Sequence, residues 1–286
     1  MPYLTVAGER AYYAHRRPVP AGQPPVVFVH GAGGTHRHWL YQVRDLAAPP
    51  HGDLLRPPAF ALDLPGHGRS AGVGQDSIAA YGDWLVAFLD VADVDRAVLV
   101  GHSMGSAIAL DVALRQPSRV EGLGLVATGA RLRVAPAILD GILNEPEGAV
   151  RLICDWAFGS GVPAEMVRLG RRQMAETAPG VLHADFLACD AFDVRDRLTA
   201  ISVPTMILCG TADRMTPVKY STYLHDQIPG ATLHLVEGAG HMVMLEQPQA
   251  VVSALLAFFD GVQPASPPAR DGRLPPPGPC LLYTSP

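Results

Sequence analysis

One segment of the chain, residues 97–115, constrains the fold more than any other. Residues 97–100 are apolar and partly β-branched, which predicts a buried strand, and residues 106–115 have the pattern of a helix. Between them lies the pentapeptide Gly101-His-Ser-Met-Gly105. Glycines on both sides of Ser103 are typical of a tight, strained turn, because a Cβ there would collide with the neighbouring strand or helix. The segment therefore predicts a strand–turn–helix unit that exposes the Ser103 hydroxyl beside the positive end of a helix.

Short apolar strands and helical segments alternate through most of the chain. The expected strands lie at 3–6, 10–14, 26–29, 59–62, 97–100, 123–127, 205–209 and 233–236, and the expected helices at 39–46, 78–91, 106–115, 218–227 and 248–259. The first two strands are expected to form an edge hairpin. The others need crossover connections, because parallel neighbours cannot be joined by a tight turn. We therefore expect an α/β fold with a mostly parallel sheet flanked by helices.

Residues 131–198 interrupt this alternation with helical apolar stripes and no expected strand. Because they stand between two strands, we interpret them as a helical lid (cap) inserted into one core made of 1–130 and 199–261. The composition then changes to Pro, Ala, Ser and Gly without periodicity, which predicts a disordered tail at 262–286. The end of this tail resembles the translated read-through of a cloning step, and we assign the tail no function.

Composition and charge narrow the class of partner. The chain is 48% hydrophobic and 17% charged with a net charge of −5, which argues against nucleic acid and anionic membranes as partners. No apolar stretch approaches the ~18 residues that a membrane helix requires. The first residues lack the pattern of a signal peptide, so we expect a cytoplasmic protein. We also expect it to be a monomer or a homodimer. The four cysteines lack metal-ligand spacing, which favours reduced thiols, although a Cys154–Cys189 bridge stays open.

Acid and base candidates follow later strands. A serine hydroxyl is a weak nucleophile until a base takes its proton, and the base needs a third group to hold its tautomer. Asp213 comes just after the strand at 205–209, and His241 lies in a glycine-flanked loop after the strand at 233–236. Because the carboxyl ends of parallel strands meet at one sheet edge, we expect Ser103, Asp213 and His241 to lie close together.

Five stretches of this sequence together resemble the α/β-hydrolase fold family over residues 1–261, each at the end of an expected strand. They are HGAGG (30–34), DLPGHGRS (63–70), GHSMG (101–105), GTADRMTP (210–217) and GAGHMVMLEQP (238–248). The resemblance implies that Ser103 is the nucleophile, that His241 is the general base and then acid, and that Asp213 orients His241. It also implies an oxyanion hole formed by the backbone N–H groups of Ala32 and Met104.

Several neighbouring residues have competing interpretations. In some relatives the acid follows the strand that here lies at 123–127, but residues 128–130 offer no carboxylate, which favours Asp213. Asp63 also follows a strand, yet its loop favours a structural turn. His102 is expected to pack away from the site rather than to catalyse. His36 and His38 could line the mouth of the site or bind a metal, but no third metal ligand lies near them in the sequence, so they are expected to be solvated.

The nucleophile type narrows the chemistry that the resemblance implies. Family members that displace halide or open epoxides use Asp where this chain has Ser103, so acyl transfer is expected. We predict a carboxylesterase-like serine hydrolase that cleaves an ester with a small to medium acyl group through an acyl-enzyme intermediate. The alternatives are a lactonase and a cofactor-free, haloperoxidase-like perhydrolase. A carbon–carbon bond hydrolase is less favoured because Gly31-Ala-Gly-Gly34 departs from the usual oxyanion loop of that group, and a non-catalytic ligand-binding homologue is also less favoured.

The expected substrate is a small-molecule ester or lactone, and the mechanism needs no cofactor or metal. Candidates to line the substrate site are His30, Gly31, Trp156, Phe158 and Met242. The aromatic residues of the lid suggest an apolar acyl or alcohol group, although most apolar lid residues are expected to pack the lid against itself and the core.

Overall fold

The computed structural model describes residues 3–16, 24–46 and 57–262. Apart from Val262, the expected tail lies outside the described residues, as does Cys280. Cys154, Cys189 and Cys209 are buried and free, so the Cys154–Cys189 bridge is not formed. Within the described ranges, no helix combines the length and the apolar character needed to cross a membrane.

The core of the fold is one eight-stranded sheet with the order β1-β2-β4-β3-β5-β6-β7-β8. Its strands are β1 (Tyr3–Val6), β2 (Glu9–Arg16), β3 (Val26–Val29), β4 (Ala59–Leu62), β5 (Ala97–His102), β6 (Val120–Val126), β7 (Thr205–Gly210) and β8 (Thr232–Val236). The β1–β2 and β2–β4 pairings are antiparallel and all others are parallel. The expected edge hairpin and mostly parallel sheet are both present.

The longer helices that follow the strands are α1 (Leu40–Leu46), α2 (Ile78–Val91), α3 (Met104–Arg115), α8 (Val218–Gln227) and α10 (Pro248–Gly261). Short helical turns accompany them: η1 (His36–Trp39), η2 (Pro117–Arg119), η3 (Leu198–Ala200) and α9 (Val243–Glu246). Two of the boundaries have simple local causes. The Ser77 side chain caps α2 by accepting from Ala80 N–H, and Pro248 starts α10 where its missing N–H costs nothing.

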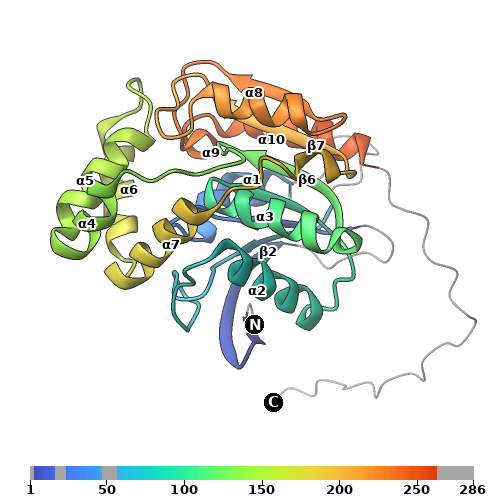
Figure 1. The fold of residues 1–286 in the computed structure, drawn as a ribbon, viewed down its shortest axis with the longest axis horizontal. Helices are drawn as coiled ribbons and strands as arrows, with labels where there is room; N and C mark the ends of the chain where they lie inside the picture. The colour runs from blue at the N-terminus through green and yellow to red at the C-terminus, as the bar shows by residue number, and fades with distance from the viewer. Residues whose placement is uncertain (1–2, 17–23, 47–56, 263–286) are drawn as a thin grey trace, which may run out of the picture.

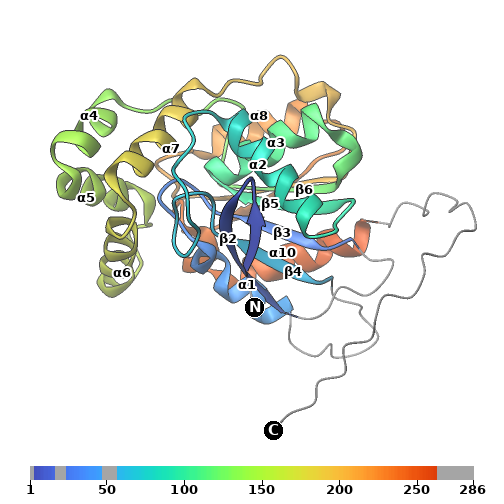
Figure 2. The same cartoon turned by 90° about the horizontal axis from the view of Figure 1, so that it is seen from below.

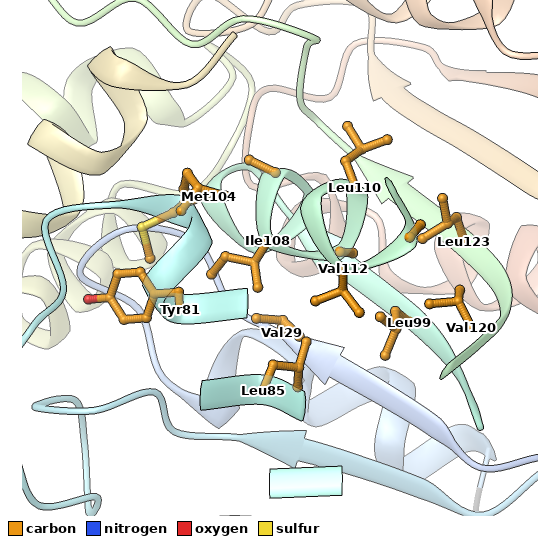
Figure 3. Close-up of a cluster of buried hydrophobic side chains, with 14 of the residues drawn as sticks. Val29, Tyr81, Leu85, Leu99, Met104, Ile108, Leu110, Val112, Val120 and Leu123 are labelled. Atoms are coloured by element: carbon orange, nitrogen blue, oxygen red, sulfur yellow. The ribbon is translucent and has the colours of Figure 1, made fainter. Parts of the chain in front are cut away.

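Helices cover both faces of the sheet, and alternate strand residues point to the two faces (Figures 1 and 2). Val27 and Val29 of β3 pack into the cluster that contains α2 and α3, whereas Val26 and Phe28 pack toward α1 and α10. Figure 3 shows part of the first cluster, in which Ile108 of α3 lies among side chains of the sheet and of α2. Burial on both faces explains why the inner strands β3 and β4 are continuous apolar runs, whereas the edge strand β8 is partly exposed and contains polar residues.

Four α-helices precede η3 between β6 and β7: α4 (Pro136–Asn144), α5 (Pro146–Ala157), α6 (Ala164–Ala175) and α7 (Pro179–Ala191). Figures 1 and 2 show them gathered at one side of the sheet. They share a separate apolar cluster that includes Ile142, Ile153 and Phe186. An isolated bridge between Arg131 and Asp193 joins the two ends of this insertion. Residues 131–198 are called the α4–α7 segment below.

Candidate active site

Ser103 lies between β5 and α3 in a backbone conformation that L-residues rarely adopt, with φ 53° and ψ −115°. Such a residue costs about 1–3 kcal/mol and persists only where its surroundings fix it. Ser103 N–H donates to the Val126 carbonyl at 2.9 Å. A Cβ on Gly101 would lie 2.2 Å from the carbonyl carbon of Gly105, and one on Gly105 would lie 2.3 Å from the Val29 oxygen. Both glycines are therefore needed for the turn that presents Ser103.

Asp213 and His241 form a buried hydrogen-bonded pair, with Asp213 Oδ2 2.8 Å from His241 Nδ1. Asp213 Oδ1 accepts from the N–H groups of Met215 (2.8 Å) and Thr216 (2.9 Å). Because a carboxylate only accepts, Nδ1 carries a proton, and in the neutral ring Nε2 then keeps its lone pair. Burial alone would raise the pKa of Asp213, but His241 and the Thr216 donors outweigh it and hold that pKa below its ordinary value.

Ser103 and His241 line the same two adjoining pockets. Within the described part of the chain, no hydrogen bond joins the Ser103 hydroxyl to His241. Catalytic hydrogen bonds of this kind are often long without substrate and tighten in the complex. The structure thus brings the three predicted residues to one sheet edge, with the Asp213–His241 contact formed.

The loop after β3 carries the predicted oxyanion residue Ala32. Gly34 N–H donates to the Gly31 carbonyl at 3.0 Å and closes a tight turn at 31–34 in which Gly33 has φ +63°. This turn is called the oxyanion turn below, after the predicted donor that it carries. His30 is fully buried, donates from Nδ1 to the Gly31 carbonyl (2.8 Å) and accepts at Nε2 from Leu64 N–H (3.1 Å). Burial lowers the pKa of His30, in agreement with this neutral tautomer.

Met104, the other predicted oxyanion donor, is the first residue of α3. The first N–H groups of a helix have no acceptor within it. Ser106 and Ala107 donate back to the Ser103 carbonyl, at 3.0 and 3.2 Å. Met104 N–H has no such acceptor within α3, and it belongs to the residue that directly follows Ser103. Ala32 lines the second pocket together with Ser103. One predicted donor therefore precedes Ser103 in the sequence and the other directly follows it.

The two pockets differ in size and in the residues that line them. The larger has a cavity volume of about 170 Å³, and its lining residues include Trp156, Tyr220 and the arginines Arg131, Arg133 and Arg214. The smaller, about 60 Å³, is lined mostly by apolar residues that include Phe158, Met174 and Met242. Among the predicted lining residues, Trp156 thus borders one pocket and Phe158 and Met242 the other. Neither pocket is lined by His30 or Gly31.

The competing histidines and carboxylate have clear structural partners. His102 is buried below the loop after β8 that carries His241 (the histidine loop), with Nε2 3.0 Å from the His241 carbonyl. It lines the smaller pocket together with Ser103 and His241, so the expectation that it packs away from the site is wrong. Asp63 accepts from His36 N–H (2.7 Å) and from Arg69 N–H (2.9 Å), as a structural turn requires.

The expectation that His36 and His38 are solvated is wrong. The His36 side chain is only 14% exposed, and its Nδ1 lies 2.8 Å from Asp63 Oδ1. His38 is more deeply buried. Its ring is buried against the oxyanion turn and lines the smaller pocket, and burial lowers its pKa to about 4.

Sequence reasoning missed the side chains that support the pair. Thr216 Oγ1 donates to Asp213 Oδ2 at 2.9 Å and lies 3.2 Å from His241 Nδ1. Glu246 Oε2 accepts from Gly240 N–H (2.8 Å) and so holds the histidine loop. Burial raises the pKa of Glu246. A threonine three residues after an aspartate is an ordinary spacing, and only the folded loop shows that it reaches back to the carboxylate.

Comparisons with known proteins agree with this architecture. The model of the alpha/beta hydrolase family matches residues 26–254. A solved structure of a thermophilic esterase is 35% identical, covers 91% of this chain and 97% of its own, and superposes with a TM-score of 0.78. The structure of Est816, an N-acyl homoserine lactone degrading enzyme, is 28% identical, covers 90% of this chain and 100% of its own, and has a TM-score of 0.78.

A curated relative is the dihydrolipoyllysine-residue acetyltransferase component of the acetoin cleaving system of Pseudomonas putida. It is 30% identical over 250 residues, which are 83% of this chain and 64% of that protein. The chain therefore spans less than two thirds of the length of this relative. The fold and the strained serine turn agree with the family match over residues 26–254. The chain therefore belongs to the α/β-hydrolase family, a family of hydrolases with esterase members.

Proposed function

We propose that this protein is a serine hydrolase that cleaves a carboxylic ester through an acyl-enzyme intermediate. The observation that carries the proposal is the buried Asp213–His241 pair at the same pocket as the strained Ser103. With Nδ1–H directed at Asp213, the free lone pair of His241 is at Nε2, the nitrogen that can take the Ser103 proton. The fold and the family match support this assignment.

Each residue then has a defined step. Ser103 Oγ attacks the ester carbonyl carbon while His241 takes its proton, and the N–H groups of Ala32 and Met104 stabilise the oxyanion. His241 next protonates the leaving alcohol, which leaves an acyl group on Ser103. His241 finally activates water to release the acid. Loss of one oxyanion donor typically costs about 3 kcal/mol of transition-state stabilisation.

Two connected pockets suit a substrate with one part on each side of the scissile bond. The smaller pocket is mostly apolar, is lined in part by the oxyanion turn and accepts a small to medium apolar group. The larger pocket accepts a group that can lie beside its arginine side chains. Trp156, Phe158 and Met174 bring side chains of the α4–α7 segment to these pockets. We therefore propose that this segment is the substrate-covering lid.

A lactone is the second candidate substrate. The solved relative that degrades N-acyl homoserine lactones is 28% identical over nearly the whole chain. In a lactone the acyl and alcohol parts stay joined after ring opening, and pockets that share Ser103 and His241 can hold both ends of one product.

The test is a panel of p-nitrophenyl esters from C2 to C12 together with a series of lactones. The proposal expects wild type to hydrolyse short and medium esters and Ser103→Ala to lose that activity. Ser118→Ala is the matched control, because Ser118 is exposed in η2. A wild-type protein that hydrolyses no compound of the panel contradicts the proposal. Turnover of lactones with little ester hydrolysis would select the second candidate.

A further inference from the structure

Asp185 of α7 is a fully buried carboxylate that lies outside the proposed triad. Its Oδ2 accepts from Gly33 N–H at 2.8 Å and lies 2.8 Å from His67 Nε2. Its Oδ1 accepts from the Tyr81 hydroxyl at 2.5 Å. A buried charge is costly unless it is paired and hydrogen-bonded. Asp185 is paired by three groups that come from three separate parts of the chain.

The partner His67 has the geometry of an imidazolium. Its Nδ1 lies 3.0 Å from the Pro65 carbonyl, and its Nε2 faces Asp185. Both neighbours can only accept, so both ring nitrogens must donate. Burial by itself would lower the pKa of His67, but Asp185 outweighs it and the pKa is raised. The α4–α7 segment is thus fixed to the loop after β4 by a buried ion pair.

The same segment holds the oxyanion turn at several points. Besides the Asp185 contact, Gln173 Nε2 donates to Thr35 Oγ1 at 2.8 Å, and Thr177 Oγ1 donates to the Gly33 carbonyl at 3.4 Å. Leu182 covers the turn, since a Cβ on Gly33 would lie 2.6 Å from Leu182 Cδ1. Both polar groups of the Gly33 backbone are therefore bonded to side chains of the α4–α7 segment.

Tyr81 contacts Asp185 from the side of the main core. Its ring belongs to the buried cluster of α2 and α3, with the hydroxyl at the end away from Leu99 and Val120 (Figure 3). The Asp185 carboxylate therefore connects the main core, the loop after β4 and the turn that carries Ala32. A carboxylate that only balanced the charge of His67 would not need the third contact to Gly33 N–H.

We propose that Asp185 is a positioning residue: it fixes the turn at 31–34, so that the α4–α7 segment sets the place of the oxyanion donor Ala32 N–H. The inference rests on the proposed function, since it concerns the same reaction centre. Removal of the carboxylate frees Gly33 N–H and lets the turn change its conformation. Such a change lowers transition-state stabilisation more than substrate binding, because the oxyanion forms only during the reaction.

The kinetic test compares Asp185→Ala, Asp185→Asn and Tyr81→Phe with wild type. We expect kcat of Asp185→Ala to fall about 100-fold with little change in KM, the size of effect that a displacement of about 1 Å can produce. Asp185→Asn should fall only several-fold, because its amide oxygen can still accept from Gly33 N–H. Tyr81→Phe should fall least, since Asp185 Oδ2 keeps both of its contacts.

Leu187→Ala is the matched control, because Leu187 lies on the same helix, is exposed and borders neither pocket. It should leave kcat unchanged. A rise in KM at constant kcat in Asp185→Ala would mean that Asp185 only shapes the pocket, and would overturn the proposal. An equal fall in Leu187→Ala would overturn it as well.

Amide hydrogen exchange of a peptide that covers 30–36 gives a readout independent of activity. We expect faster exchange in Asp185→Ala than in wild type and Leu187→Ala. If Asp185→Ala does not fold, the isosteric Asp185→Asn carries the kinetic measurement, and wild-type kcat in that variant refutes the proposal. If wild type hydrolyses no ester, the proposed function fails, while the exchange comparison still decides whether Asp185 holds the turn.

Discussion

The two sides of the proposed reaction centre are supported in different ways. On the side of Ser103, Asp213 and His241, the main supports are close in sequence: Gly101 and Gly105 flank the serine, and Thr216 bonds the aspartate three residues before it. On the side of the oxyanion turn, the supports are remote, since Gly33 is held by Asp185, 152 positions away. The first side depends on local backbone geometry, and the second depends on how the α4–α7 segment packs.

The largest expected effect is on the local side. Asp213→Asn removes the acceptor that fixes His241 Nδ1–H, and the wrong tautomer then faces Ser103. We expect kcat to fall roughly 10⁴-fold with the fold intact. Ester hydrolysis and circular dichroism measured together check this. A fall no larger than that of Asp185→Ala would remove the difference between the two sides.

Gly105→Ala and Gly180→Ala compare one glycine from each side. A Cβ at Gly105 meets the Val29 carbonyl oxygen at 2.3 Å and the backbone there cannot yield, whereas a Cβ at Gly180 in α7 has no atom within 4 Å. We expect Gly105→Ala to lose about 1–3 kcal/mol of unfolding free energy together with its activity. Gly180→Ala should gain about 0.5–1 kcal/mol. Urea unfolding measures both, and equal effects would contradict the packing described.

Thr216→Val should have a smaller effect on the local side. The substitution preserves shape but removes the hydroxyl that donates to Asp213 Oδ2. Asp213 keeps its bonds to His241 and to the Thr216 N–H, so we expect kcat to fall about tenfold, equivalent to about 1.4 kcal/mol. Steady-state kinetics on one ester suffices. Unchanged kcat would mean that the Thr216 hydroxyl does not help to hold the pair.

The smallest expected effect is on the dependence of stability on pH. His67 has a raised pKa in the folded protein, so its stabilisation is complete below about pH 6.5 and is lost as the pH rises through the folded value. His38, with a folded pKa of about 4, acts in the opposite direction: its contribution is present above about pH 6.5 and is lost as the pH falls toward 4.

Unfolding free energies of wild type and His67→Gln between pH 5 and 9 test these signs. The variant should have a lower unfolding free energy overall. Above about pH 6.5 its unfolding free energy should also fall less steeply with pH than that of wild type, because the His67 contribution is missing. An identical slope in both proteins above that pH would mean that His67 is not the imidazolium partner of Asp185.

The glycines and the three candidate catalytic residues of the local side could be predicted from the sequence, whereas the Thr216 hydroxyl contact and the supports of the remote turn could not. The glycines around Ser103 and the loops that carry Asp213 and His241 follow apolar strands, so their order and their common sheet edge follow from the pattern. Helix boundaries at 78–91 and 218–227 were predicted as found, because apolar spacing and flanking residues determine them locally.

No comparable sequence pattern marks Asp185 as a functional residue. It stands in α7 between apolar residues such as Leu182 and Phe186, and a single aspartate in such a stripe is usually at the solvated edge of a helix. Its three partners are separated from it by between 104 and 152 positions. His38 was predicted wrongly for the same reason, because its burial depends on the turn at 31–34 folding over it.

The central claim is that Ser103 is the nucleophile, and covalent labelling with a fluorophosphonate tests it most directly. Peptide mass spectrometry of the labelled wild-type protein should place one adduct on Ser103, with labelling absent in Ser103→Ala and strongly slowed in Asp213→Asn. Ester hydrolysis that persists in Ser103→Ala, or an adduct on any residue other than Ser103, would contradict the account.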